Sequence, residues 1–570
     1  MLSSPMSPPP KTVAALLLTL LLLLPISFLY AEWPSTGVNV TPNNHPDYDF
    51  AMVADRLGGV YIGWFDRYND GGAPVQRVDR DGNLVWGDPI SVVDVDEYGY
   101  LKLMNLLEAP GEDVYVTYDA IPNDSIQYRA GIQRLSPDGE RLWGETGVEV
   151  APGEYWSWIG DFFRNRESIV SDGAGGVIVA YNIHMWGDEN EDLFALATSH
   201  VAPEGTLDWS ARRMSPWSGT PYSSKAVSDS LGGAIVLYSD QEANLYASHI
   251  NSEGEVDWLD NPPLFGPDLG FNGTGYCFTN RPNWAPGETM VVVKSVRQYY
   301  QIHVGTDGRS VYPDHARLIT TRYNPESVFY EFPIENGHVY LPVGNSFEML
   351  RLYKLNEQGE HLFGEEGLMI DNNPLICGPF YSIVKLDSTF IFTYGISLVG
   401  ACFQRIGFNG EFTWGDSCGH PVNEYQRLPS EIAMCQTSPD TLMMAWFVGP
   451  ETRIMAMQVF SDGRSAGYEV SVDEEVQCID ERSLYIESVL PNPSNASFSV
   501  RVSIPYEGSY TFQLFNIEGR LVHSDRVLYG TEGTHSWSCS NHTFASGVYF
   551  LRLIDPKRNK AALQKIAIIR

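Results

Sequence analysis

VDRDGNLVW (78–86) decides the fold of most of this chain. It places an apolar residue four positions before a glycine and an aromatic residue four positions after it. The phrase occurs eight times between residues 37 and 470, with its glycine at Gly82, Gly139, Gly205, Gly254, Gly308, Gly359, Gly410 and Gly463. The preceding apolar residues are Val78, Leu135, Val201, Ile250, Val304, Leu355, Ile406 and Val459. The following position is aromatic in seven copies and is Gly467 in the eighth.

The spacing of the repeat predicts the architecture. Separations run from 49 residues (Gly205 to Gly254) to 66 residues (Gly139 to Gly205). The first copy contains four short strand patterns, DFAMVAD (49–55), VYIGW (60–64), APVQRVD (73–79) and LVWG (84–87), separated by glycine-containing turns. A repeat of this length made only of strands and turns is typical of a β-propeller, in which each repeat forms one blade. We expect an all-β chain with eight four-stranded blades over residues 32–470, seven blades being the alternative.

The N-terminal segment predicts how the ring closes. WPSTGVNV (33–40) resembles WGETGVEV (143–150), which follows the second copy of the phrase. We therefore expect residues 33–40 to complete the last blade by pairing with segment 452–470, because an open ring would leave an unpaired strand edge.

Five tryptophans occupy the aromatic position of the repeat: Trp86, Trp143, Trp209, Trp258 and Trp414. We expect them to be buried between blades. The hairpin resembles that of quinoprotein-type propellers, where a tryptophan after a glycine turn docks one blade on the next. SPDGERLW (136–143) also loosely resembles the Asp-box of sialidases, although there the glycine stands two positions after the aspartate. The vicinal cysteine pair of quinoprotein dehydrogenases is missing, so the resemblance implies the fold and neither activity.

The residue directly before the conserved apolar position forms a second column of equivalent positions. It is basic or histidine in seven copies and Gln458 in the eighth. The seven are Arg77, Arg134, His200, His249, His303, Lys354 and Arg405. Three histidines one repeat apart suggest zinc, but neighbouring blades would separate them by far more than ~2 Å ligand bonds allow. We expect structural pairs with the acid that closes the first strand, namely Asp55, Asp172, Asp229 or Asp387. WD-repeat propellers hold their blades with a comparable Asp–His arrangement.

Charge and targeting signals predict an exported protein. Lys11 precedes an apolar run, Val13 to Tyr30, that ends at Ala31, so residues 1–31 read as a secretory signal peptide, with an uncleaved anchor as the alternative. No later segment is expected to span a membrane. The net charge of −34 argues against nucleic acid as a partner. It fits a soluble exported surface or an affinity for calcium, for which DVDEYGY (94–100) and DENED (188–192) are candidate loops.

No enzyme motif or cofactor motif stands out. The seven cysteines form no metal-ligand pattern, and Cys402 and Cys418 could form a disulfide. HExxH and P-loop motifs are missing. We therefore predict no catalytic, cofactor-binding or metal-binding residues, apart from the candidate calcium loops.

The last part of the chain has a different character. After a linker (471–484), residues 485–570 alternate apolar and polar residues between turns, which predicts a small β-sandwich of about seven strands. This module resembles the C-terminal sorting domain of type IX secretion, and it shares much of its pattern with the hook-capping immunoglobulin-like domain. The resemblance rests on four ordered motifs, whose residues are Pro491, Asn492, Pro493, Asn516, Gly519, Arg520, Gly533, Thr534, His535, Ser546, Gly547, Val548 and Tyr549.

The resemblance implies export from a Gram-negative cell to its surface or medium, with the outer-membrane secretion machinery as a partner. The family usually ends in a basic pair before an apolar run, whereas Gln564 and Lys565 stand here. For the propeller we expect a non-enzymatic binding protein with a glycan or protein ligand. The alternative is a secreted polysaccharide hydrolase or lyase, which would need carboxylates converging at the channel mouth.

Overall fold

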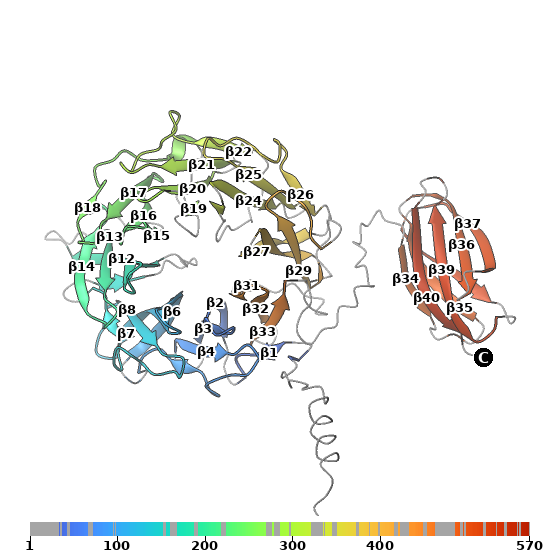
Figure 1. Ribbon diagram of the computed structural model, residues 1–570, viewed down its shortest axis with the longest axis horizontal. Coiled ribbons are helices and arrows are strands. Elements are labelled where there is room, and N and C mark those ends of the chain that lie inside the picture. Colours follow the sequence, from blue (N-terminus) through green and yellow to red (C-terminus); the bar gives the residue numbers. More distant parts are fainter. Residues whose placement is uncertain are drawn as a thin grey trace, which may run out of the picture.

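The computed structural model describes residues 33–461 and 485–568 apart from short gaps, the longest of which are 160–167, 218–223, 270–275, 279–284, 321–333 and 422–431. Figure 1 shows the sheets of the first part following one another around a ring. The regular structure in the described residues is strand, apart from the 3-10 turn η2 (Pro267–Leu269) and a 3-10 residue at Asp96. Within those residues no helix is long and apolar enough to cross a membrane. The predicted signal peptide (1–31) and linker (471–484) lie outside the described residues.

The described residues of the ring form antiparallel sheets in chain order. The first sheet contains β2 (Pro46–Ala54), β3 (Val60–Asp66), β4 (Pro74–Val78) and β5 (Ile90–Ser91), and the second contains β6 (Tyr98–Glu108), β7 (Val114–Pro122), β8 (Arg129–Leu135) and β9 (Val148–Glu149). The third contains β10 (Trp156–Trp158), β11 (Ile169–Ser171), β12 (Val177–Trp186), β13 (Asp192–Val201) and β14 (Leu207–Arg213). The fourth contains β15 (Ser224–Ser228), β16 (Ala234–Ser239), β17 (Leu245–Ile250) and β18 (Val256–Asp257).

The same order continues around the ring. The fifth sheet contains β19 (Tyr276–Phe278), β20 (Thr289–Lys294), β21 (Tyr299–Val304) and β22 (Arg317–Thr320), and the sixth contains β23 (Ile334–Glu335), β24 (His338–Gly344), β25 (Leu350–Leu355) and β26 (Leu368–Asp371). The seventh contains β27 (Ile376–Leu386), β28 (Thr389–Ile396), β29 (Gly400–Gly407) and β30 (His420–Pro421). The eighth contains β31 (Ile432–Ser438), β32 (Thr441–Val448) and β33 (Arg453–Phe460), completed by β1 (Val38–Asn39).

The N-terminal segment joins the two ends of the ring, as its sequence predicted. Val38 pairs with Ala456 and Asn39 with Met455, so β1 is the outer strand of the eighth sheet. Trp33 then reaches the first sheet, where its Nε1 donates a hydrogen bond to the carbonyl oxygen of Arg80 at 3.0 Å. Its indole is buried, with 3% of its surface exposed, and lies against Gly82. Strand pairing and one anchored indole therefore link the last sheet to the first.

The fourth strand of the first repeat lies later than its pattern predicted. Residues 84–87 form a turn, and the strand that pairs with β4 is Ile90–Ser91. Asp79 stabilises the preceding turn by accepting hydrogen bonds from the backbone N–H of Asp81 and Asn83 at 2.9 and 2.8 Å. The chain then leaves the sheet at Trp86, whose indole docks on the next repeat, and it returns to the ladder only after that contact.

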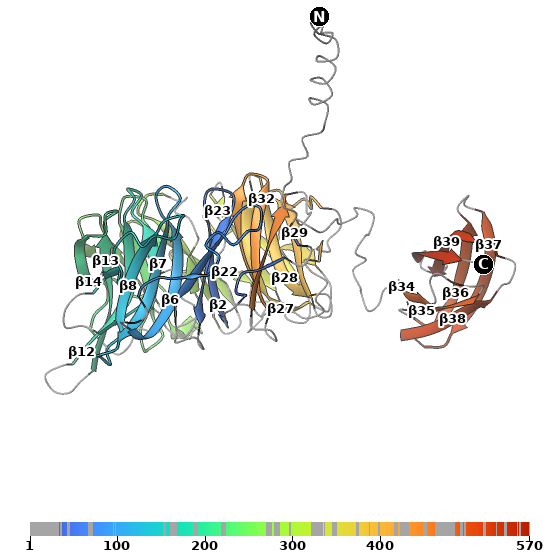
Figure 2. The ribbon, with the colours of Figure 1, turned by 90° about the horizontal axis from the view of Figure 1, so that it is seen from below.

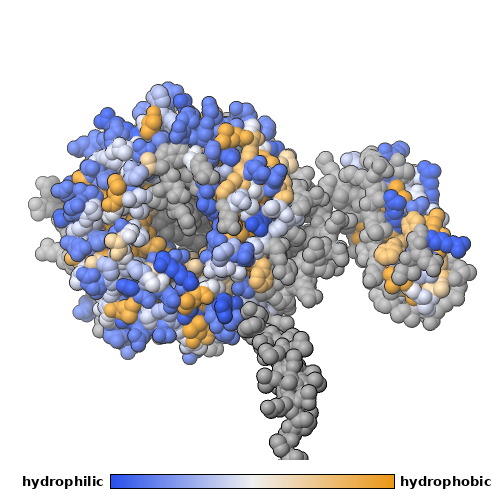
Figure 3. Space-filling view, in the orientation of Figure 1, coloured by the Kyte–Doolittle hydropathy of each residue, from blue (hydrophilic) through white to orange (hydrophobic). Residues whose placement is uncertain are grey.

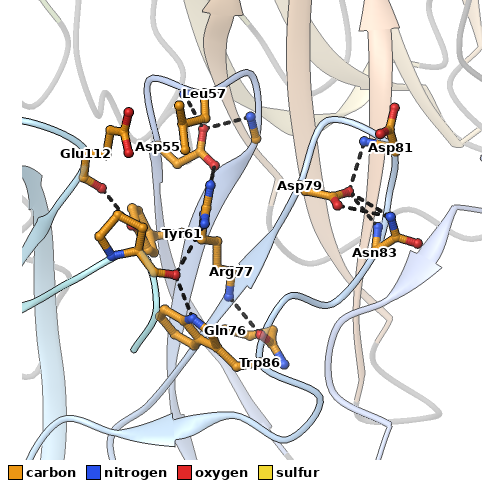
Figure 4. A network of polar contacts seen from close by, with 12 residues as sticks. Asp55, Leu57, Tyr61, Gln76, Arg77, Asp79, Asp81, Asn83, Trp86 and Glu112 are labelled. Carbon is orange, nitrogen blue, oxygen red and sulfur yellow. Dashed lines mark hydrogen bonds and ion pairs between the residues drawn. The ribbon is translucent and has the colours of Figure 1, made fainter. Parts of the chain in front are cut away.

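The repeat phrase builds the joint between neighbouring sheets. A Cβ on Gly139 would lie 3.3 Å from the Trp86 indole and 2.0 Å from Ile90, and the φ of Gly139 is +86°, so glycine is required for two reasons. Trp86 Nε1 donates to the Pro137 carbonyl oxygen at 2.9 Å, as Figure 4 shows. The same bond, always to the residue two before the next repeat glycine, is made by Trp143 to Pro203, Trp209 to Ser252, Trp414 to Ser461 and the Tyr312 hydroxyl to Glu357.

The expectation that all five repeat tryptophans are buried was wrong in degree. Only Trp209 is buried, at 6% exposure, whereas Trp86, Trp143, Trp258 and Trp414 are partly buried. The indoles of Trp86, Trp143 and Trp414 cover a turn of the next sheet and keep part of their surface exposed, whereas Trp209 belongs to the core between the third and fourth sheets. The aromatic residues near the ends of the second strands are all buried, namely Trp64, Tyr118, Tyr181, Tyr238, Tyr394 and Trp446.

The column of cations is structural, as predicted. Arg77 pairs with buried Asp55 through Nη2 at 2.9 Å, and its Nη1 donates to the Pro137 carbonyl oxygen at 3.2 Å. Figure 4 shows this guanidinium linking the first strand of its own sheet to the turn of the next sheet. The predicted partners Asp172 and Asp229 bind His200 and His249, each at 2.9 Å. Arg134, His303 and Arg405 instead use Asp113, Glu288 and Thr389, and the predicted Asp387 lies outside the described residues.

The C-terminal part is a two-sheet sandwich of seven described strands. One sheet has the order β34 (Tyr485–Leu490), β35 (Ser497–Ile504) and β38 (Gly533–Ser540). The other has the order β37 (Leu521–Tyr529), β36 (Gly508–Asn516), β39 (Gly547–Asp555) and β40 (Lys560–Ile568). Trp537 stacks on Phe512 between the sheets, with ring centroids 4.3 Å apart, and its Nε1 donates to Asp525 at 2.9 Å.

Candidate functional site

Candidate ligand contacts lie on the face of the ring where the second and third strands of each sheet are joined. We call this the lower face, following Figure 2, in which β12 projects farthest on that side. Figure 3 shows the opposite face of the ring, whose visible surface is mostly hydrophilic with small scattered apolar groups. A compact group of partly exposed aromatic side chains is typical of a binding surface.

The third sheet carries such a group, which we call the aromatic cluster: Trp156, Trp158, His184 and Phe194. Trp156, His184 and Phe194 are direct neighbours across β10, β12 and β13, because Trp156 pairs with His184 and His184 with Phe194. Direct antiparallel partners project from the same face of a sheet, so these three side chains form one row.

The rings of the aromatic cluster touch one another. His184 stacks on Phe194 at 4.5 Å between centroids, and Trp156 meets His184 edge-on at 5.4 Å. Trp158, two residues along β10, lies edge-on to Phe194 at 6.1 Å. His184 is buried, whereas Trp156, Trp158 and Phe194 keep part of their surface exposed. The cluster is thus a fixed platform with three rings available to a ligand.

The second sheet holds β10 in place. The hydroxyl of Ser157 accepts a hydrogen bond from the backbone N–H of Ala130 at 2.9 Å, and Ser157 N–H donates to the Tyr128 carbonyl oxygen at 3.0 Å. Buried Asp119 accepts from the N–H of Ile159 at 2.6 Å. Since side chains alternate along a strand, Ser157 faces the second sheet while Trp156 and Trp158 face away from it. The platform is therefore positioned by contacts from both sheets.

A second aromatic group continues along the lower face over the first two sheets. Tyr100 lies 5.9 Å from Phe65 and 5.9 Å from Tyr128, measured between ring centroids. Tyr128 is 37% exposed, and Lys102 places its Nζ 6.0 Å from the Phe65 centroid. Tyr128 connects this second group with the aromatic cluster. Its backbone carbonyl oxygen accepts the hydrogen bond from the N–H of Ser157, the residue between Trp156 and Trp158.

One buried acceptor lies beside the aromatic cluster. Asn182 is the strand partner of Trp158 and is only 3% exposed. Its Oδ1 has no hydrogen-bond partner in the described part of the chain. A buried acceptor without a donor is costly, so a hydroxyl-bearing ligand or a water would be stabilised there.

The structure describes only part of the two predicted calcium loops. Asp94 and Asp96 lie in a turn where Asp94 Oδ1 accepts the N–H of Asp96 at 3.1 Å, and residues 188–191 lie outside the described residues. Within the residues that the structure describes, no group of three or more His, Cys, Asp or Glu could hold a metal ion. Cys418 also lies outside the described residues, and Cys539, whose pKa burial raises to about 11, is free.

The sorting-motif residues lie at turns and strand ends of the sandwich. Asn516 and Arg520 close one turn, in which Asn516 Oδ1 accepts the Arg520 N–H at 2.9 Å. Gly533, Thr534 and His535 begin β38. Ser546 precedes β39, which opens with Gly547, Val548 and the buried Tyr549. Pro491, Asn492, Pro493 and Gly519 lie outside the described residues.

The aromatic cluster was missed at the level of sequence. His184 and Phe194 are far from Trp156 along the chain and become neighbours only through strand register. The local signal was WSW (156–158), whose alternation places two tryptophans on one side of a strand.

Comparisons with known proteins agree with the sandwich assignment. Residues 488–569 match the secretion system C-terminal sorting domain family. A comparison with curated proteins finds no matching sequence. Structurally similar chains include the BP39L lectin of Burkholderia pseudomallei, with 11% identity over 74% of this chain and 98% of the lectin at a TM-score of 0.36.

Two further solved structures are similar. PorZ, a surface component of the type IX secretion system of Porphyromonas gingivalis, is 11% identical over 92% of this chain and 93% of its own, at a TM-score of 0.18. A quinoprotein alcohol dehydrogenase-like protein of Bacteroides thetaiotaomicron is 11% identical over 70% of this chain and 96% of its own, at 0.28. These low scores carry no argument about activity. The match at 488–569 does identify one part: the chain carries a secretion-system C-terminal sorting domain, which marks it as a type IX export substrate destined for the cell surface or the extracellular space.

Proposed function

We propose that this protein is an exported glycan-binding protein whose ring holds the ligand on the lower face, across the aromatic cluster. The observation that carries the proposal is the row Trp156–His184–Phe194 with Trp158 beside it, in which the rings of Trp156, Trp158 and Phe194 are partly exposed.

The chemistry of the cluster favours sugars over other ligands. The C–H-bearing face of a pyranose is flat and weakly apolar, and it stacks on indole or phenyl rings. Tryptophan and tyrosine supply large contact areas with little loss of conformational entropy. Asn182 Oδ1 adds an acceptor for a sugar hydroxyl, and Tyr100 and Tyr128 extend the aromatic surface toward the first sheet.

The finer architecture belongs to the same proposal. We propose an eight-bladed propeller over residues 32–470, in which β1 completes the eighth blade. A signal peptide (1–31) precedes it, and a linker (471–484) leads to the sorting sandwich (485–570). Eight sheets in chain order, with β1 paired to β33, support this count.

Glycan binding is tested by titrating the purified full-length protein with oligosaccharides in a glycan array and then by calorimetry. We expect Trp156→Ala and Trp158→Ala each to weaken binding at least tenfold. Tyr506→Ala, which removes a 39% exposed aromatic ring from the sandwich, is the matched control and should bind like the parent protein. Unchanged affinity in both tryptophan variants would refute the site.

The alternative, a polysaccharide hydrolase or lyase, is distinguished in the same experiment. Analysis of the titrated glycans by mass spectrometry should show intact ligand if the ring only binds. Shortened products that depend on the protein would favour the enzyme.

A further inference from the structure

The sorting sandwich has an apolar row on the outer face of its four-stranded sheet. Leu514 is fully buried between the sheets, so the next residue, Phe515, points outward. Phe515 pairs with Leu521 on β37 and with Phe550 on β39. These three residues therefore form a continuous row across three strands that lie side by side in Figure 1, and we call it the outer row.

The outer row is accessible and stands apart from its surroundings. Leu521 is 46% exposed, and Phe515 and Phe550 are partly exposed. The row beside it on the same face is polar, with Ser524, Gln513 and Arg552 as direct partners. Three adjacent apolar side chains next to polar ones are typical of a contact surface rather than of chance exposure.

The sorting motifs converge on the outer row. Asn516 follows Phe515, Arg520 precedes Leu521, and Tyr549 precedes Phe550. The Asn516–Arg520 turn is closed by two hydrogen bonds, of 2.9 and 3.0 Å, which set the distance between β36 and β37 at this point. Tyr549 is buried, and its hydroxyl donates to the Ala545 carbonyl oxygen at 2.9 Å, which fixes the start of β39. The motif residues thus hold the row in place without belonging to it.

We propose that the outer row is the surface by which the sorting domain docks on a protein component of the outer-membrane secretion machinery. The domain is a sorting signal, so a receptor must read a feature that is exposed while the sandwich is folded. The row ends at Leu521 on β37, which is an end strand of its sheet. Within the described residues, its outer edge pairs with no other strand and offers backbone groups to a partner strand. A protein partner can use both features, whereas a lipid surface would use only the apolar row.

The test compares two leucines on one strand. Leu521→Glu places a charge in the outer row, and Leu528→Glu places the same charge at the other end of β37, where Leu528 is 77% exposed. Both side chains are too exposed to support the core. In a host with type IX secretion, we expect the amount of full-length Leu521→Glu protein outside the cell to be at least tenfold lower than that of the parent. The variant should accumulate in the periplasm. The Leu528→Glu protein should be exported like the parent.

Folding and partner identity are checked separately. Melting of the purified variants should match the parent, and a photo-cross-linking amino acid at position 521, but not at 528, should yield an adduct with an outer-membrane component of the secretion machinery. Normal export of Leu521→Glu and of Phe550→Ser, equal loss in Leu521→Glu and Leu528→Glu, or adducts with lipid or with the ring alone would each overturn the proposal. None of these readouts involves glycan binding, so they stand or fall apart from the function proposed for the ring.

Discussion

Replacing Trp33 with alanine tests whether the N-terminal segment holds the ring together. The indole is 3% exposed, lies against Gly82 and donates one hydrogen bond to Arg80. Burying a tryptophan removes roughly 150–250 Å² from water, which is worth about 4–6 kcal/mol at 25 cal/mol per Å². Large-to-small substitutions of buried aromatics cost about 3–5 kcal/mol. We therefore expect Trp33→Ala to lower the free energy of unfolding by about 4 kcal/mol.

The assay is urea unfolding of the purified protein followed by circular dichroism, because fluorescence would change with the removed indole. Trp33→Phe is the graded control: it keeps an aromatic ring against Gly82 but loses the hydrogen bond and part of the buried ring, so it should cost less than Trp33→Ala. Deleting residues 32–40, which also removes the pairing of β1 with β33, should destabilise at least as much as Trp33→Ala. If the unfolding midpoints of the alanine variant and of the deletion equal that of the parent, the N-terminus does not close the ring.

The remaining predictions concern the joints and the export signal. Trp209→Ala should cost about 3–5 kcal/mol in urea unfolding and Trp86→Ala less, because only Trp209 is buried, and equal costs would contradict this ranking. Burial tends to lower the pKa of His249, but Asp229 and Asp257 outweigh it and raise that pKa. Its contribution to stability is therefore complete below the unfolded value of about 6.5 and is lost as pH rises through the folded value. Burial tends to raise the pKa of Asp172 and of Asp229, yet hydrogen bonds from His200 and His249 and from backbone N–H groups lower both. The contribution of these two carboxylates to stability is therefore present above their unfolded pKa values and is lost as pH falls through their folded pKa values. The protection factors of β16 and β17 against hydrogen exchange, corrected for the intrinsic rate at each pH, should accordingly be highest between about pH 4 and 6.5, and His249→Asn should remove the loss of protection at alkaline pH. A chain that ends near Arg482 should stay periplasmic while the full-length chain reaches the surface or medium, and equal export of the two would show that the sandwich is not the signal.

The spacing of the repeat was enough to predict the ring of sheets, because its chemistry is local. A glycine with positive φ, an apolar residue four before it and an aromatic residue four after it describe one hairpin and one docking side chain, as at Gly139 and Trp86. The likeness of residues 33–40 to 143–150 predicted the pairing of β1 for the same reason. The sorting sandwich was equally readable, because its turns carry their own residue types in order.

Tertiary structure decided what those local patterns leave open. The second acceptor of Arg77 is the carbonyl oxygen of Pro137, and a backbone carbonyl is present in every residue, so no sequence pattern distinguishes it. Trp156, His184 and Phe194 meet through the register of three strands, and Leu521, Phe515 and Phe550 meet in the same way across a β-bulge. A shift of register by one residue would turn each of these side chains to the opposite face. The sequence therefore determined the sheets and their order, whereas register decided which side chains share a surface, and with it where a ligand or a receptor can bind.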